Sequence, residues 1–293
     1  MSAANPTKAG AETTEVAFTF VQALASELSG GKVELPGFPH IVFRVQRVLA
    51  DANADAARIV RVIGGEPTLA GQLVRMANSA AFNPGKVPVA DLRAAVARVG
   101  LDTVRTATIA CAIQQLRSAP QLRGLEKQLD KLWRKNILVA SLSHVVARRL
   151  TQVNPDAALL AGMLQGIGKL YILTRASGHR QLFADPESYQ TIEQDWHLSI
   201  AAALLENWGI SDEIVTAVHD SENYDREVRG APTLSDVLIV GVILAEHHDK
   251  PDVLGAQVQC AKPLQRLQLT LEKCESFIRE SAKEVNALRE ALS

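Results

Sequence analysis

The stretch Ala157-Ala-Leu-Leu-Ala-Gly-Met-Leu-Gln-Gly-Ile-Gly-Lys-Leu170 decides how the chain is interpreted. It is an apolar segment of helical character that carries one polar pair, Gln165-Gly166. Its glycines do not follow a predicted strand, so they do not form a phosphate-binding loop. We expect them instead to let neighbouring helices pack closely. The stretch therefore predicts a central helical element of the core.

The composition predicts a helical protein of ordinary size. The 293 residues are 47% hydrophobic and 22% charged, which suits one large core or two modest ones. Aromatic residues make up only 4%, so aliphatic side chains on helices must supply the core volume. We therefore predict an all-α fold of two lobes.

Charge and cysteine content exclude several classes of function. The net charge of −1 gives no overall attraction to nucleic acid or to anionic membranes. A basic trend between Arg117 and Arg149 is interrupted by Glu126 and Asp130, so we interpret it as a solvated face. The three cysteines form no Cys-x-x-Cys pair, which indicates thiols in a reducing compartment.

No segment predicts export or a membrane span. Residues 1–14 lack the layout of a signal peptide. The apolar run Val237–Ala245 is bounded by Asp236 and Glu246 and is far shorter than the roughly 20 residues that a bilayer requires. We predict a cytoplasmic protein without a membrane partner.

Hydrophobic periodicity and capping residues predict a series of helices. Asp55 and Asp156 are expected to be N-caps, and Asn78 is expected to fix the loop that follows it. The expected helices cover residues 16–28, 41–50, 56–63, 67–78, 89–99, 102–116, 122–150, 156–170, 192–207, 212–219, 234–247 and 264–292. The last is amphipathic, and the width of its apolar stripe favours packing on the lobes over self-association of two copies.

Several motifs in the right order resemble the HDOD domain, an HD-related output domain. They are Leu35-Pro36, Glu66-Pro67-Thr-Leu69, Leu73-Val-Arg-Met-Ala-Asn78-Ser79-Ala80, Ala95-Val-Ala-Arg-Val-Gly100, Trp133, the stretch around Gly162, and Trp208. Glu66 replaces an aspartate of the family. The resemblance covers about residues 33–248 and implies an N-terminal lobe over 33–116 and a degenerate HD-like lobe over 122–248. Segments 1–32 and 249–293 flank it. Within the motifs we expect structural roles for Pro67, Asn78, Ser79, Trp133 and Trp208.

The resemblance also implies where an active HD protein would hold its metal. The early histidine of the HD pattern falls near Lys135, and the His-Asp doublet falls on Gln165 and Gly166. A later aspartate would lie near Gly241 and Val242, where the chain is apolar. Divalent metals need imidazole or carboxylate donors, which these positions lack. We therefore expect no metal, no cofactor and no catalytic residue.

Other polar residues leave a rival hypothesis open. His197 matches a family histidine and is either a ligand or a helix residue hydrogen-bonded to Glu193. His219 lies near the place of paired histidines in the family. A metal-dependent phosphohydrolase with a rearranged site would use His197 and His219 with Glu193 or Glu222. A third hypothesis is a nucleotide sensor in the vestigial pocket with Lys135 contacting the anion.

The resemblance and the missing ligands together favour a non-enzymatic role. HDOD domains are bacterial, and the resemblance implies a signal-transduction module that binds a protein partner. Neither nucleic acid nor membrane is an expected partner. Self-association through residues 264–292 is the alternative to their packing on the lobes.

Overall fold

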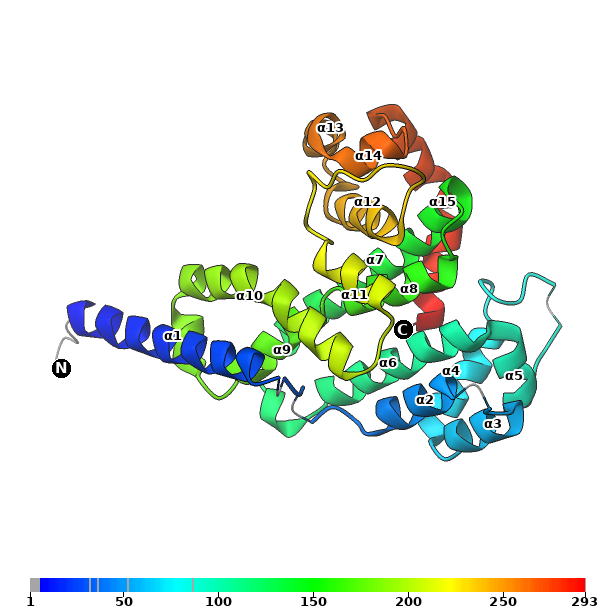
Figure 1. Ribbon diagram of the computed structural model, residues 1–293, viewed down its shortest axis with the longest axis horizontal. Coiled ribbons are helices and arrows are strands. Elements are labelled where there is room, and N and C mark those ends of the chain that lie inside the picture. Colours follow the sequence, from blue (N-terminus) through cyan, green and yellow to red (C-terminus); the bar gives the residue numbers. More distant parts are fainter. Residues whose placement is uncertain (1–5, 32, 36, 52, 86, 293) are drawn as a thin grey trace.

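The computed structural model describes residues 6–31, 33–35, 37–51, 53–85 and 87–292, with no side-chain description for residues 6–14 and 121. Within these residues every regular element is a helix, which confirms the all-α prediction. Figure 1 shows α2–α6 gathered on one side of the molecule and α7, α8 and α12–α15 stacked beside them.

The N-terminal group consists of short helices packed on one long one. Its members are α2 (Ile41–Ala50), α3 (Ala56–Gly64), α4 (Pro67–Asn78) and α5 (Leu92–Val99), with the longer α6 (Leu101–Arg117). Asp55 caps α3 by accepting a hydrogen bond of 2.7 Å from the amide of Arg58, as predicted. The helix expected from Val89 begins only at Leu92, because Asp91 caps it and accepts a bond from the amide of Ala94.

Asn78 fixes the loop between α4 and α5. Its carboxamide donates to the carbonyl of Val89 at 2.7 Å and accepts from the amide of Val89 at 2.8 Å. One side chain thus satisfies both backbone groups of a residue eleven positions away. The predicted role of Asn78 is confirmed, and this pairing is the reason that Val89 stays outside the helix.

The second group is built around α7 (Glu126–Leu150). The helices α8 (Pro155–Leu164) and α12 (Leu234–His247) pack on it. The remaining elements are α9 (Ile167–Ala176), α10 (Pro186–Asn207) and α11 (Asp212–His219), with short 3-10 turns η1 (Pro120–Leu122) and η2 (Arg180–Ala184). The first helix, α1 (Pro6–Ser29), lies along α10 and η2 at the far end in Figure 1.

Two sequence predictions about this group were wrong. Residues 156–170 do not form one helix, because the chain turns at Gln165-Gly166 and separates α8 from α9. The cap of α8 is Asn154 rather than Asp156, since the Asn154 side chain accepts from the amides of Asp156 and Ala157. The break places the polar pair at a junction between helices, inside the core.

The C-terminal region also differs from its prediction. The expected helix over 264–292 is replaced by α13 (Pro251–Cys260), α14 (Lys262–Arg266) and α15 (Leu271–Leu292). Gln268, with a φ of 54°, turns the chain between α14 and α15. Helix α15 packs against α7 and buries Phe277, Val285 and Leu288, which confirms the expected packing on the body of the protein.

Residues Pro155–Ala176 are long and apolar enough to cross a membrane by length and composition. However, 89% of this apolar window is buried inside the protein. The core helices of a folded domain have this property, because they are covered by apolar neighbours on every side. The stretch from Ala157 to Leu170 therefore lies at the centre of the core.

Glycine at 162 is predicted to be required for the contact between α7 and α8. A Cβ atom built on Gly162 lies 2.5 Å from the Cα of Ala140, a backbone atom that cannot move aside alone. We expect Gly162→Ala to lower the free energy of unfolding by about 2 kcal/mol or more, measured by urea denaturation.

The control is Gly71→Ala in α4, where the nearest heavy atom to the new Cβ is the Arg75 side chain at 3.8 Å. That variant should gain up to about 1 kcal/mol from helix propensity. Equal effects of the two substitutions would contradict the close contact.

Candidate functional site

Gln165 and Asn136 form a buried amide pair at the junction of α7, α8 and α9. Gln165 is 4% exposed and Asn136 is 2% exposed. The Nε2 of Gln165 donates a hydrogen bond of 2.8 Å to the Oδ1 of Asn136. The two side chains therefore supply a partner to each other where water cannot.

Gly166 leaves the space that the Asn136 side chain fills. A Cβ atom on Gly166 would overlap the carboxamide of Asn136. No carboxylate can project from position 166 into this space while Asn136 occupies it. The second position of the implied His-Asp doublet is thus closed by packing as well as lacking a side chain.

Lys135 does not face the Gln165 position, which corrects the sequence-based placement by one residue. The side chain of the next residue, Asn136, points there instead. The Lys135 ammonium forms an ion pair with Glu246 on α12, and both side chains are 30% exposed. Gly241 lies earlier on α12, near the expected place of the later aspartate of the HD pattern. A Cβ atom on Gly241 would overlap the hydroxyl of Ser143 on α7, so α12 packs against α7 at a glycine and no acidic side chain lies there.

His197 lies nearby on α10, in a polar contact that joins three elements. It is 1% exposed. The Nδ1 of His197 lies 2.8 Å from the backbone carbonyl oxygen of Glu193, and its Nε2 lies 3.1 Å from the Oε1 of Glu222. The Nζ of Lys169, on α9, donates to the same Glu222 oxygen at 3.1 Å. Both nitrogens of His197 therefore face acceptors.

The charge of Glu222 is stabilised by these contacts. The hydrogen bond from His197 lowers the pKa of the Glu222 carboxyl to about 2, opposed by desolvation and assisted by the positive charge of Lys169. Its side chain is 34% exposed. Glu222 is thus a fixed carboxylate that is neutralised by the Lys169 ammonium and hydrogen-bonded to the His197 imidazole, an arrangement typical of a structural ion pair.

The remaining residues of the predicted pocket do not join this contact. His219 has a side chain that is 57% exposed, and its nearest acidic contact is the neighbouring Asp220 at 3.7 Å. Glu193 contributes its backbone carbonyl to His197. Among the residues that the structure describes, no group of three or more His, Cys, Asp or Glu side chains could hold a metal ion. The donors present do not fit a metal centre of the HD type.

The other motif residues support the fold. Pro67 occupies the first turn of α4, and Ser79 donates to the carbonyl of Met76 at the end of that helix. Trp133 is buried, with the Arg117 guanidinium 5.6 Å from its ring centroid. Trp208 stacks on Phe38 with ring centroids 4.7 Å apart, which joins α10 to the segment before α2.

Sequence reasoning missed two of the central residues, Asn136 and Lys169. Lys169 lies in the opening stretch, four positions after Gln165 but on α9, beyond the turn that ends α8. Asn136 follows Trp133 by one helical turn. Neither position carries a local signal that indicates its partner, because both contacts join distant parts of the chain.

The fold and the site define an all-helical domain of the HD-like class. The sequence model of the HDOD domain matches residues 35–224, and the chain belongs to the HDOD family.

Solved structures share this fold. A candidate metal-dependent phosphohydrolase from Shewanella amazonensis SB2B superposes with a TM-score of 0.76 at 20% identity, covering 95% of this chain and 100% of that one. An HDOD domain protein of unknown function from Geobacter sulfurreducens gives 0.61 at 20% identity, covering 92% and 96%. A candidate signal transduction protein from Marinobacter aquaeolei VT8 gives 0.62 at 19% identity, covering 95% of this chain and 66% of that protein.

One curated relative, an uncharacterised protein of Treponema pallidum (strain Nichols), is 23% identical over 216 residues. The match covers 68% of this chain and 40% of the relative, so the matched region spans about two fifths of that protein.

Glu222 is predicted to stabilise the folded state in a pH-dependent way. Because its folded pKa of about 2 lies below the ordinary value of 4.5, the ionised carboxylate stabilises the fold above about pH 4.5, and this contribution is lost as the pH falls toward 2. We expect Glu222→Gln to cost about 1 kcal/mol of unfolding free energy at pH 7, an amount discounted for partial exposure.

The difference between the wild type and Glu222→Gln should shrink between pH 5 and pH 3 in urea denaturation. Glu290→Gln, at an exposed position of α15, is the matched control and should change little at any pH. A difference that grows as the pH falls would show that the carboxylate is not stabilised by these contacts.

Proposed function

We propose that this protein is a non-catalytic regulatory module of a bacterial cytoplasmic signalling pathway, and that it acts by binding a protein partner. The single observation that carries the proposal is the Gln165–Asn136 pair above Gly166, which fills the position of a metal-binding doublet with two neutral amides. Membership of the HDOD family supports a regulatory role. The relative from Marinobacter aquaeolei, named as a candidate signal transduction protein, supports the same role.

The proposal rests on the chemistry that hydrolysis requires. A metal-dependent phosphohydrolase activates water on a cation held by several imidazole or carboxylate groups. Here the nearby imidazole, His197, already contacts a carbonyl and a carboxylate. The nearby carboxylates, Glu222 and Glu246, are each neutralised by a lysine. Of the groups that a rearranged site would use, His197 and Glu222 are already hydrogen-bonded to each other.

The same contacts weigh against a nucleotide sensor in the vestigial pocket. Lys135 would have to contact the anion, and its ammonium is paired with Glu246. No observation favours this hypothesis over protein binding.

The absence of metal hydrolysis is directly testable. After incubation with manganese and desalting, we expect elemental analysis to give far less than one metal ion per chain. Hydrolysis of bis(p-nitrophenyl) phosphate should be the same for the wild type, His197→Ala and the control His40→Ala. Stoichiometric metal together with turnover that only His197→Ala abolishes would establish an enzyme.

The proposed protein partner is tested by identifying it in the cell and then measuring its binding with purified components. Proteins crosslinked to this chain in its source cell should include one that, once purified, binds the purified chain with a Kd of about micromolar or tighter, measured by calorimetry. Analytical ultracentrifugation of the chain alone separates this result from self-association. Recovery of copies of this chain only, or no binding by any purified candidate, would count against the proposal.

A further inference from the structure

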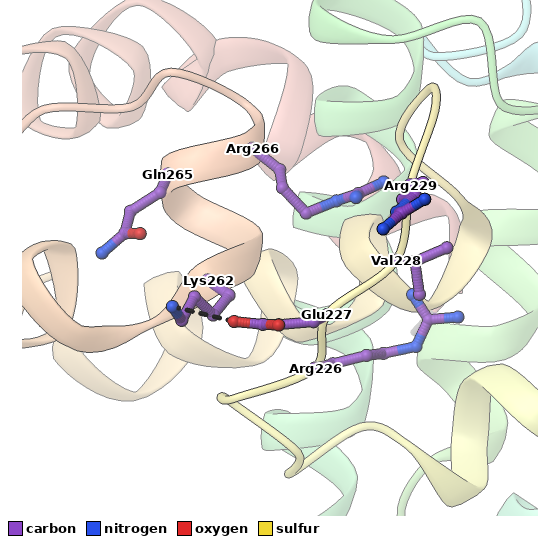
Figure 2. Close-up of a pocket in the computed structure, with 7 residues that line it drawn as sticks. All are labelled: Arg226, Glu227, Val228, Arg229, Lys262, Gln265 and Arg266. Carbon is purple, nitrogen blue, oxygen red and sulfur yellow. Dashed lines mark ion pairs between the residues drawn. The ribbon is translucent and has the colours of Figure 1, made fainter.

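A basic pocket lies apart from the Gln165 position, between the loop that precedes α12 and helix α14. Its volume is about 500 Å³, and Figure 2 shows side chains entering it from both elements. It is lined by Arg226, Glu227, Val228, Arg229, Lys262, Gln265 and Arg266. Four of these residues are cationic and one, Glu227, is anionic.

Two of the arginines are held in place by a buried acid. Asp236 is fully buried at the start of α12 and lies 3.4 Å from the NH1 of Arg226 and 3.2 Å from the NH2 of Arg266. The Nε of Arg226 also donates to Asp220 at 2.9 Å, and the NH2 of Arg266 donates to the carbonyl of Ala231 at 3.0 Å. Each guanidinium is therefore fixed along one side before any ligand arrives.

These contacts leave donors unused. A guanidinium carries five N–H donors, and the contacts above occupy a part of each set. The Nε of Arg266 is buried without a hydrogen-bond partner, in a side chain that is 17% exposed. Because this N–H is out of contact with solvent, a ligand in the pocket would be bound by the terminal guanidinium nitrogens.

The other two cations are not needed by the fold. Arg229 is exposed and has no ion pair among the described residues. Lys262 pairs at 3.1 Å with Glu227, whose side chain is 77% exposed, and such a surface pair contributes little to stability. Arg226 and Arg266 neutralise Asp220 and Asp236. Arg229 and Lys262 contact neither of these two acids. With those two acids counted, the group keeps one positive charge in excess.

We propose that this pocket binds the phosphate group of a small molecule of about mononucleotide size. Arginine forks match phosphate oxygens in a bidentate way, and Lys262 supplies a further cation once it leaves Glu227. The volume lies within the usual range for small-molecule sites. Val228, 37% exposed, offers an apolar surface to the rest of the ligand.

The site is independent of the proposed function, because it uses neither the Gln165 position nor a protein partner. Its geometry is set by the backbone, since the amide of Lys262 donates to the carbonyl of Tyr224 at 2.8 Å and joins α14 to the loop. The two walls of the pocket thus stay together without a ligand, which reduces the ordering that binding would require.

The test is calorimetric titration of the full chain with adenosine 5′-monophosphate, inorganic phosphate and adenosine. We expect saturable binding of the nucleotide, weaker binding of phosphate, and no binding of adenosine. The double variant Arg229→Ala/Lys262→Ala should weaken nucleotide binding about 10-fold or more. Both substitutions spare the contacts of Asp236, and thermal unfolding checks that the variant is folded.

Arg279→Ala, an exposed arginine of α15, is the matched control and should bind as the wild type does. The proposal is overturned by equal binding of adenosine and nucleotide, or by no binding of the nucleotide at millimolar concentration. It is also overturned if the double variant binds as tightly as the wild type. Binding only to anionic lipid vesicles or to a phosphopeptide would assign the cations to a macromolecule and reject a small ligand.

Discussion

The hydrogen bond between Gln165 and Asn136 is the interaction on which the rest of this structure depends. It lies where α7 meets the break between α8 and α9, and both side chains are almost completely buried. A buried amide without a hydrogen-bond partner lowers the stability of the fold by about 1–3 kcal/mol. Each of the two residues supplies the partner that removes this cost for the other. Gly162 and Gly166 allow this approach, because larger side chains would overlap α7. The hydrogen bond between the two amides therefore requires the close packing of α7 on α8 that the glycines allow.

The charged groups around this junction also find their partners within the protein. An HD-type metal site would neutralise its carboxylates with a cation from solution. In this chain Lys169 neutralises Glu222, to which His197 is also hydrogen-bonded, and Lys135 neutralises Glu246. Gly168 lies against the backbone carbonyl of His197, so α9 and α10 are in close contact where Lys169 and His197 meet Glu222. Protein side chains therefore supply the positive charge, and the carboxylates remain compatible with their partly buried positions.

The helices with strong local signals could be predicted from the sequence. Residues 41–50, 67–78 and 234–247 carry apolar periodicity with clear ends, and the structure has helices there. The prediction failed where tertiary contacts override local pattern. The apolar run through Gln165 continues the helical period, yet the chain turns there, at the point where the Gln165 amide contacts Asn136. Likewise the stripe over 264–292 is periodic, yet Gln268 turns the chain so that α15 can lie on α7.

The candidate site could be predicted only in part, for a similar reason. Gln165 and Gly166 stand in a recognisable motif, whereas Asn136 was missed by one position because no local signal fixes which face of α7 turns inward. The ion pair between Lys169 and Glu222 joins residues 53 positions apart, and nothing in either neighbourhood indicates the other.

The loop between α11 and α12 is held in a different way from the core. Ion pairs and hydrogen bonds fix it at both ends, through Glu222 to His197 and through Arg226 to Asp220 and Asp236. Apolar burial cannot be displaced by a charged solute, but an ion pair can exchange one partner for another of the same sign. The exposed pair between Lys262 and Glu227 beside this loop can be exchanged in this way, so an anion can replace Glu227 without opening the core. Helix α12, which follows the loop and is buried and apolar over most of its length, gives that exchange a rigid base.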